Sequence, residues 1–102
     1  MSLPVRVAVL MTCHNRRALT VRCLDSLRAQ SADADIALFL VDDGSSDGTA
    51  DAVRAVWPAA HIIVGDGALF WNGGMRLAWE TAAEAGPFDQ YLWLNEIGRA
   101  HV

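Results

Sequence analysis

The sequence predicts an α/β fold in which a parallel β-sheet is flanked by helices. Four short segments are mostly apolar, as expected of strands that are buried on both faces of a sheet. Between them lie segments whose residues repeat at i, i+3, i+4 and i+7, the period of an amphipathic helix. Strands that alternate with helices indicate βαβ units and a parallel sheet. The 102 residues leave room for one small domain.

The first strand is predicted over residues 5–11, because the run VRVAVLM is apolar and rich in β-branched residues. The polar letters TCHNRR follow it and indicate a loop. A helix is predicted over residues 18–29, where Cys23 and Leu27 lie on one stripe. The second strand is predicted over residues 36–41, where the run IALFLV is broken by DDGSSDG.

The second helix is predicted over residues 49–57, with Asp47 as its N-cap and Pro58 as its stop. A third strand is predicted over residues 61–65, which read HIIVG. The glycine-rich stretch DGALFWNGG comes next, and it predicts a loop that continues to Gly74.

The third helix is predicted to begin at Met75, where Met75 and Trp79 share a helical stripe, and to end at Gly86 and Pro87. The fourth strand is predicted over residues 91–94, which read YLWL. No internal repeat and no low-complexity linker interrupts this order. We therefore expect a single α/β unit.

The composition argues against several classes of protein. The net charge is −4 and all eight basic residues are arginines, a balance that speaks against a nucleic-acid partner. No apolar run approaches the roughly 20 residues that span a bilayer, and no export signal is visible. Cys13 and Cys23 have no CxxC partner, so they are expected to be reduced packing residues. We expect a cytoplasmic protein.

Polar residues follow the predicted strands at their carboxyl ends. In open parallel sheets, ligands bind in the crevice outside these ends. The sequence therefore predicts a ligand site at one edge of the sheet. Its candidate residues are Thr12, His14 and Asn15 after the first strand, Asp42, Asp43 and Gly44 after the second, and Asp66 and Gly67 after the third.

The acidic loop VDDGSSDGT also resembles a calcium loop. Counted from Asp43, it places acidic or hydroxyl residues at positions 1, 3, 5 and 9, and Gly48 at the position of the turn glycine. However, Arg54 stands where a bidentate glutamate is required, and the loop follows a strand instead of a helix. A calcium-loop protein is thus the weakest of the alternatives.

A dinucleotide-binding fingerprint is missing at the first turn. The GxGxxG motif should follow the first strand, yet TCHNRR contains no glycine, and no Walker A loop is present. A nucleotide bound here would be held mainly by side chains. A non-catalytic α/β module that binds nucleotides remains an alternative to an enzyme.

Four segments carry a resemblance to a known family. VLMTCHNRRALTVRCLDSL, LFLVDDGSSDGTADAVR, GDGALFWNGGMRLAW and YLWLN together resemble the N-terminal half of a family 2 inverting glycosyltransferase with the GT-A fold. The resemblance covers residues 5–95, so residues 1–95 are expected to be the N-terminal part of such a domain. The third segment resembles the branch that contains bacterial rhamnosyltransferase-like enzymes of surface-polysaccharide synthesis.

The resemblance implies a nucleotide-sugar donor, a UDP- or dTDP-sugar, and transfer with inversion to a saccharide or lipid-linked acceptor. It further implies work at the cell envelope, with peripheral membrane association. The loop with Thr12, His14 and Asn15 would hold the nucleoside. Asp43 would accept a hydrogen bond from the pyrimidine N3–H.

The same resemblance gives roles to three further residues. Asp42 would orient the loop or meet the ribose, and Gly44 would permit close backbone approach. Arg76 is expected at the amino end of the third helix, where anions are favoured, and would face the diphosphate.

In the family, an acidic pair after the fourth strand binds Mg²⁺ or Mn²⁺, and a carboxylate further along acts as the catalytic base. This chain reads WLNEIGRAHV, so Glu96 could be one metal ligand while Ile97 could not be the second. No catalytic base follows, and the 102 residues alone are expected to be inactive. EIGRAHV is one translation of a common sequencing-adapter sequence, so residues 96–102 are expected to be a non-native read-through tail.

Overall fold

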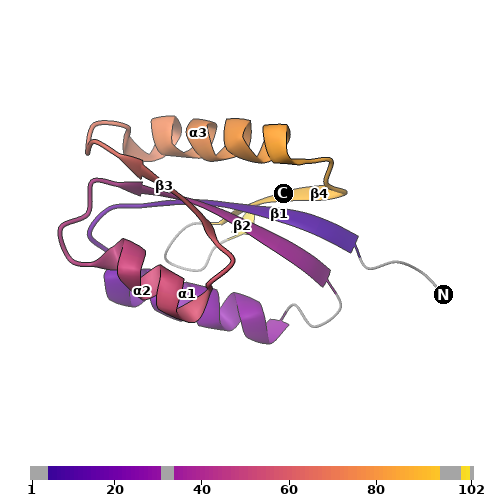
Figure 1. Ribbon diagram of the computed structural model, residues 1–102, viewed down its shortest axis with the longest axis horizontal. Coiled ribbons are helices and arrows are strands. Elements are labelled where there is room, and N and C mark those ends of the chain that lie inside the picture. Colours follow the sequence, from indigo (N-terminus) through magenta and orange to yellow (C-terminus); the bar gives the residue numbers. More distant parts are fainter. Residues whose placement is uncertain (1–4, 31–33, 95–99, 102) are drawn as a thin grey trace.

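The computed structural model describes residues 5–30, 34–94 and 100–101. They form a sheet with helices on both faces, which confirms the predicted fold class (Figure 1). The strands are β1 (Val5–Cys13), β2 (Ala34–Asp43), β3 (His61–Gly65), β4 (Gln90–Leu94) and β5 (Ala100–His101). The helices are α1 (Arg17–Gln30), α2 (Thr49–Val56) and α3 (Phe70–Ala85).

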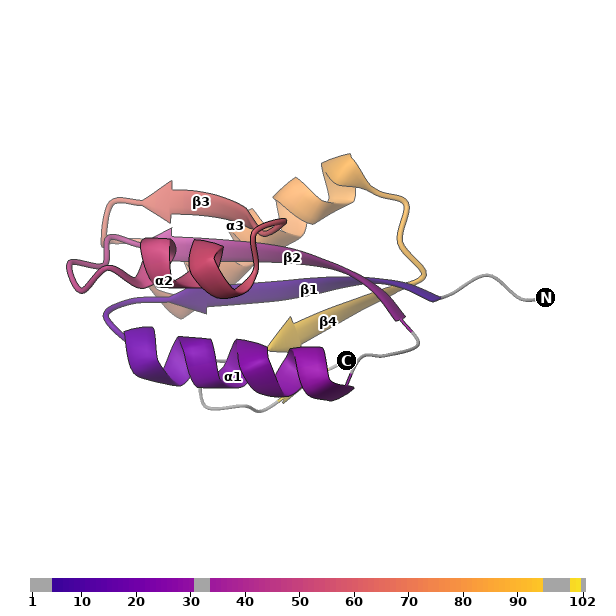
Figure 2. The same cartoon turned by 60° about the horizontal axis from the view of Figure 1, so that its bottom comes forward.

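The strands lie in the order β3-β2-β1-β4-β5, which Figure 2 shows side by side from β3 to β4. The pairs β1–β2, β1–β4 and β2–β3 are parallel, and β5 pairs antiparallel with β4. Helix α3 covers one face of the sheet, and α1 and α2 cover the other (Figure 1). None of the helices in the described residues is both long and apolar enough to span a bilayer.

Each face of the sheet has its own apolar core. Successive side chains of a strand point to opposite faces. Thus Leu38 and Leu40 of β2 pack toward α1 and α2, whereas Phe39 and Val41 pack toward α3. Leu10 of β1 joins the second group and is fully buried. Burial on both faces explains why the strand sequences are apolar without alternation.

The first two strands are longer than the sequence indicates. Thr12 and Cys13 of β1 pair with Val41 and Asp42 of β2, so the ladder continues into polar residues. Their side chains are buried where the sheet meets its helices, which is why polarity alone gave a strand end too early. Asp42 and Asp43 are therefore the last two residues of β2 and do not belong to the loop that follows it.

Helix α3 begins at Phe70, five residues before the predicted start, so the predicted glycine-rich loop up to Gly74 is wrong in its second half. A helix interior tolerates glycine when packing requires it. A Cβ on Gly74 would lie 2.7 Å from the Cβ of Thr12, which is closer than real Cβ contacts come. Gly74 therefore lets the first turns of α3 lie directly on the carboxyl end of β1.

The two adjacent helical glycines should respond oppositely to alanine. Gly73→Ala should raise the free energy of unfolding by about 0.5–1 kcal/mol, because its Cβ meets only the Leu69 side chain at 3.4 Å and alanine favours helix. Gly74→Ala should lower it by about 2 kcal/mol through overpacking against Thr12. Urea unfolding of both variants measures the difference. Equal effects would show that α3 does not contact β1 this closely.

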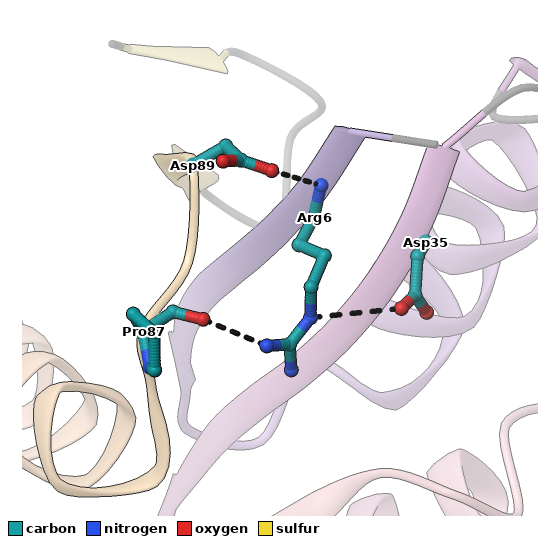
Figure 3. A network of polar contacts seen from close by, with 4 residues as sticks. All are labelled: Arg6, Asp35, Pro87 and Asp89. Atoms are coloured by element: carbon teal, nitrogen blue, oxygen red, sulfur yellow. Dashed lines mark hydrogen bonds and ion pairs between the residues drawn. The ribbon is translucent and has the colours of Figure 1, made fainter. Parts of the chain in front are cut away.

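Polar contacts fix the segment between α3 and β4 to the start of β1 (Figure 3). The Arg6 N–H donates to Asp89 Oδ2 (2.8 Å), and the Asp89 N–H donates to the Arg6 carbonyl (2.8 Å). The Arg6 guanidinium donates to the Pro87 carbonyl (2.9 Å) and lies 3.7 Å from Asp35. One arginine thus aligns the amino ends of β1, β2 and β4.

Candidate functional site

A cavity of about 300 Å³ lies at the carboxyl ends of the strands, beside the first turn of α3. The sequence-predicted residues Thr12, His14 and Asp43 lie together in its wall. The complete lining comprises Thr12, Cys13, His14, Arg16, Asp43, Gly67, Phe70 and Trp71. The parallel topology therefore brings together side chains from loops that are distant in sequence.

Asp43 is a buried carboxylate held by backbone N–H groups. Its side chain is only 4% exposed. Oδ1 accepts from the Gly67 N–H (2.8 Å), and Oδ2 accepts from the N–H groups of Phe70 (3.0 Å) and Leu69 (3.1 Å). Burial raises the pKa of Asp43, but the Gly67, Phe70 and Leu69 hydrogen bonds outweigh it, so the pKa lies below its ordinary value. Asp43 is therefore ionised at neutral pH.

The backbone conformation around Phe70 explains how these N–H groups converge. Leu69 is right-handed (φ −76°, ψ −34°), whereas Phe70 is left-handed (φ 56°). A right-handed residue followed by a left-handed one forms a concave nest of N–H groups that suits an anion. Here the Asp43 carboxylate is that anion, which ties the carboxyl end of β2 to the start of α3.

His14 is oriented by the main chain of the same aspartate. Its Nδ1 lies 2.6 Å from the Asp43 carbonyl oxygen, and its Nε2 lies 3.3 Å from Asn15 Nδ2. A carbonyl oxygen only accepts, so Nδ1 carries the proton and Nε2 of the neutral ring accepts from the Asn15 amide. The imidazole is thereby fixed in the wall of the cavity.

Asn15 lies outside the lining of this cavity and instead joins two loops. Its N–H donates to Ser45 Oγ (2.9 Å), and its Oδ1 accepts from the Ser46 N–H (2.7 Å). Asn15 has a left-handed φ of 50°, which asparagine adopts more readily than most residues. The structure thus gives Asn15 a role in holding the β1–α1 loop against the β2–α2 loop.

Asp47 serves both adjoining helices, although Gly48 takes the N-cap position that the sequence assigned to Asp47. Its Oδ1 accepts from the Thr49 N–H (3.1 Å) and the Thr49 hydroxyl, and its Oδ2 accepts from the Arg17 N–H (3.1 Å). These are the first residues of α2 and α1. The helix dipole favours a carboxylate at the amino end of each of these two helices.

Asp42 and Gly44 shape the acidic loop without lining the cavity. Asp42 is buried, and its Oδ1 accepts from the Ser45 N–H (3.1 Å), which supports the loop-orienting alternative of its two expected roles. Gly44 has a φ of +72°, and a Cβ there would lie 2.8 Å from the Gly67 backbone nitrogen. The close approach that Gly44 permits in the described residues is thus to the neighbouring β3–α3 loop.

Arg76 lies away from the cavity. The prediction that it opens the third helix is also wrong. Because α3 begins at Phe70, Arg76 falls in its second turn, where its side chain is 82% exposed and pairs with Glu80 (Nε–Oε1 3.1 Å). Arg76 instead borders a second cavity of about 300 Å³, whose other lining residues are Trp71, Asn72, Met75, Trp79 and Trp93. The cation in the wall of the first cavity is Arg16.

The described residues contain no cluster of three or more metal-ligating side chains. Among residues 5–30, 34–94 and 100–101, no group of three or more His, Cys, Asp or Glu side chains is placed to hold a metal ion. The carboxylates of Asp42 and Asp43 are engaged by backbone N–H groups. Glu96, the expected ligand, lies outside the described residues, as does most of the expected read-through tail.

Stability should fall in acid because of two aspartates. The pKa of Asp47 is lowered by the Thr49 hydroxyl and by the Arg17 and Thr49 N–H groups, against its own desolvation, and the pKa of Asp43 is lowered as well. Their folded pKa values lie below the unfolded value, so their contribution is complete above about pH 4 and is lost as pH falls further. Urea unfolding between pH 2.5 and 6 measures this. The Asp43→Asn/Asp47→Asn double variant should show a flatter profile, and an unchanged profile would contradict the assignment.

Comparisons with known proteins agree with the fold. The family model described as Glycosyl transferase family 2 matches residues 8–84, which include every residue of the cavity wall. A search of curated proteins found no match.

Several solved structures share the architecture. A mannosyltransferase from Pyrobaculum calidifontis, solved with GDP-Man and Mn²⁺, superposes with a TM-score of 0.69 at 22% identity over 95% of this chain and 28% of its own. Glucosyl-3-phosphoglycerate synthase from Mycobacterium tuberculosis, with Mn²⁺, UDP and glucosyl-3-phosphoglycerate, gives 0.62 at 20% identity over 91% of this chain and 33% of its own. The chain thus spans about a third of each.

Proposed function

The chain belongs to glycosyl transferase family 2, and on that premise we propose that it is the nucleotide-binding part of an enzyme that transfers a hexosyl group from a nucleotide-diphosphate sugar. One observation carries the proposal: the cavity at the carboxyl ends of β1 and β2 combines an ionised acceptor, Asp43, with a fixed ring, His14, and a cation, Arg16. These are the groups needed for a base edge, a base face and a diphosphate.

Asp43 is proposed to read a pyrimidine base. An ionised carboxylate offers about four acceptor positions. Three N–H groups, those of Gly67, Leu69 and Phe70, donate to its two oxygens, and Asp43 still lines the cavity. The remaining acceptor capacity suits the N3–H of uracil or thymine, a donor that cytosine lacks. This is compatible with the UDP- or dTDP-sugar that the sequence resemblance implies.

Arg16 is proposed to replace Arg76 as the diphosphate ligand. It lines the same cavity as Asp43 and His14, whereas Arg76 is paired with Glu80 on an exposed part of α3. A guanidinium binds phosphate oxygens through charge-assisted and often bidentate hydrogen bonds. Thr12 lines the same cavity and is proposed to contact the nucleoside.

The remaining assignments follow the sequence resemblance. They are inversion at the sugar, a saccharide or lipid-linked acceptor, a rhamnosyltransferase-like role in cell-envelope polysaccharide synthesis, a cytoplasmic location with peripheral membrane association, and Mg²⁺ or Mn²⁺ as cofactor. Such an ion would neutralise charge on the diphosphate leaving group. The described residues alone do not supply its ligands, so these assignments belong to the whole enzyme.

Nucleotide titrations test the proposal. UDP, dTDP and GDP are titrated with Mn²⁺ against the protein while the fluorescence of Trp71, in the cavity wall, reports binding. We expect saturable binding of the pyrimidine nucleotides. Arg16→Gln should weaken UDP binding about tenfold, since it removes a charge-assisted contact, while Arg22→Gln, on the exposed side of α1, should not. Calcium binding without nucleotide binding would favour the calcium-loop alternative instead.

A further inference from the structure

Phe70 combines two properties that are unusual for a large apolar residue. Its φ of 56° is left-handed, which for a bulky residue is a strained conformation. Its side chain is also 74% exposed, the largest exposure among the large hydrophobic residues described. Strained residues persist only where their surroundings hold them, and they cluster at functional sites.

Hydrogen bonds to Asp43 hold the strained backbone in place. The Phe70 N–H donates to Asp43 Oδ2 (3.0 Å), and the Leu69 N–H donates to the same oxygen (3.1 Å). The nest needs a left-handed residue at position 70, but it needs no side chain there. A glycine would adopt this conformation without strain.

The phenyl ring contributes little to the folded core. It is mostly exposed, it belongs to neither apolar core, and among the described residues no other aromatic ring pairs with it. It does line the cavity, together with His14 and Asp43. The ring is therefore best explained by what enters the cavity.

We propose that Phe70 provides an aromatic face that stacks on the nucleobase, and that the left-handed backbone serves to present this face. The inference rests on the proposed function. Asp43 holds two of the three aromatic side chains in the cavity wall: its carbonyl accepts from His14, and its carboxylate accepts from the Phe70 N–H. One residue thus supplies the acceptor proposed for the base edge and also holds the two rings proposed for the base faces, His14 and Phe70.

A glycine substitution separates the two roles of position 70. Phe70→Gly keeps the N–H groups of the nest and relieves the strained φ, so the midpoint of thermal unfolding should rise by about 5 °C. The same variant loses the ring, so UDP should bind roughly tenfold more weakly. Phe70→Tyr keeps the ring and should bind UDP as the wild type does. Inorganic diphosphate has no base, and its affinity should be the same in all three proteins.

Each other outcome has a distinct meaning. If Phe70→Gly binds UDP as tightly as the wild type, the stacking role is wrong while the proposed function stands. If its unfolding midpoint falls, the ring belongs to the fold and the inference is overturned as well. If the wild type binds neither UDP nor dTDP, the proposed function fails, and the inference fails with it.

Discussion

Asp43→Ala is expected to lower the free energy of unfolding by about 3–5 kcal/mol. The change leaves the N–H groups of Gly67, Leu69 and Phe70 without their acceptor beneath the start of α3. Each buried N–H left unpaired costs about 1–3 kcal/mol, and partial hydration of the emptied space offsets some of the sum. Small domains are stable by only about 5–15 kcal/mol, so the substitution should remove a large fraction of the stability.

Two further variants sharpen this prediction. Asp43→Asn keeps one carbonyl acceptor but turns an amide donor toward N–H groups, so it should lose about half as much stability. Asp66→Ala is the matched control, because Asp66 lies in the β3–α3 loop to which Asp43 is bonded and accepts one exposed hydrogen bond from the Ala68 N–H (2.9 Å). That control should cost less than about 1 kcal/mol. Equal losses in Asp43→Ala and Asp66→Ala, measured by urea unfolding, would show that the buried carboxylate does not organise the loop.

Gly44→Ala is expected to destabilise the protein by about 3 kcal/mol. A left-handed φ costs a non-glycine residue about 1–2 kcal/mol. In addition, the new Cβ would lie 2.8 Å from the Gly67 nitrogen and 3.0 Å from the Gly67 Cα, and a backbone cannot move aside as a side chain does. The β3–α3 loop would have to shift, which would also disturb the Gly67 N–H bond to Asp43.

Gly48→Ala separates the two causes. Gly48 has a similar φ of +80°, but the nearest atom to its Cβ is Arg17 Nη1 at 3.5 Å, at the end of a flexible side chain. Its substitution should therefore cost only the conformational strain, about 1–2 kcal/mol. Chemical denaturation of both variants measures the difference. A Gly48→Ala loss as large as that of Gly44→Ala would mean that strain alone, without the close approach, sets the cost.

Local pattern was sufficient for β1 to β4 and their core, because runs such as the one around Phe39 must be buried on both faces, but it did not predict the antiparallel strand β5. It also found Thr12, His14 and Asp43, since chain topology places strand ends at one edge. It failed at the start of α3. The glycines at 73 and 74 normally indicate a loop. Gly74 packs on Thr12, which is distant in the sequence, and a local pattern cannot predict such a contact.

The roles of individual polar residues were similarly hidden. The Asp43 carboxylate is bonded to groups 24 to 27 positions later in the chain, and Asn15 is bonded to Ser46, 31 positions later. Spacing along the sequence indicates which residues lie near an edge of the sheet, but not which of them face one another. Arg76 is an example. The helix begins five residues earlier than the sequence predicts, and Arg76 therefore lies outside the cavity.

The hydrogen bonds that join the loops after β1 and β2 bear on the entropy of binding. Asn15 of the first loop is bonded to Ser45 and Ser46 of the second, and Arg17, at the start of α1, is bonded to Asp47. Loops that are disordered before binding lose conformational freedom when a ligand orders them, and that loss weakens affinity. Here the two loops are already fixed to each other, so a ligand meets a preorganised wall. Discrimination between ligands should then depend on their fit to a fixed shape rather than on closure around them.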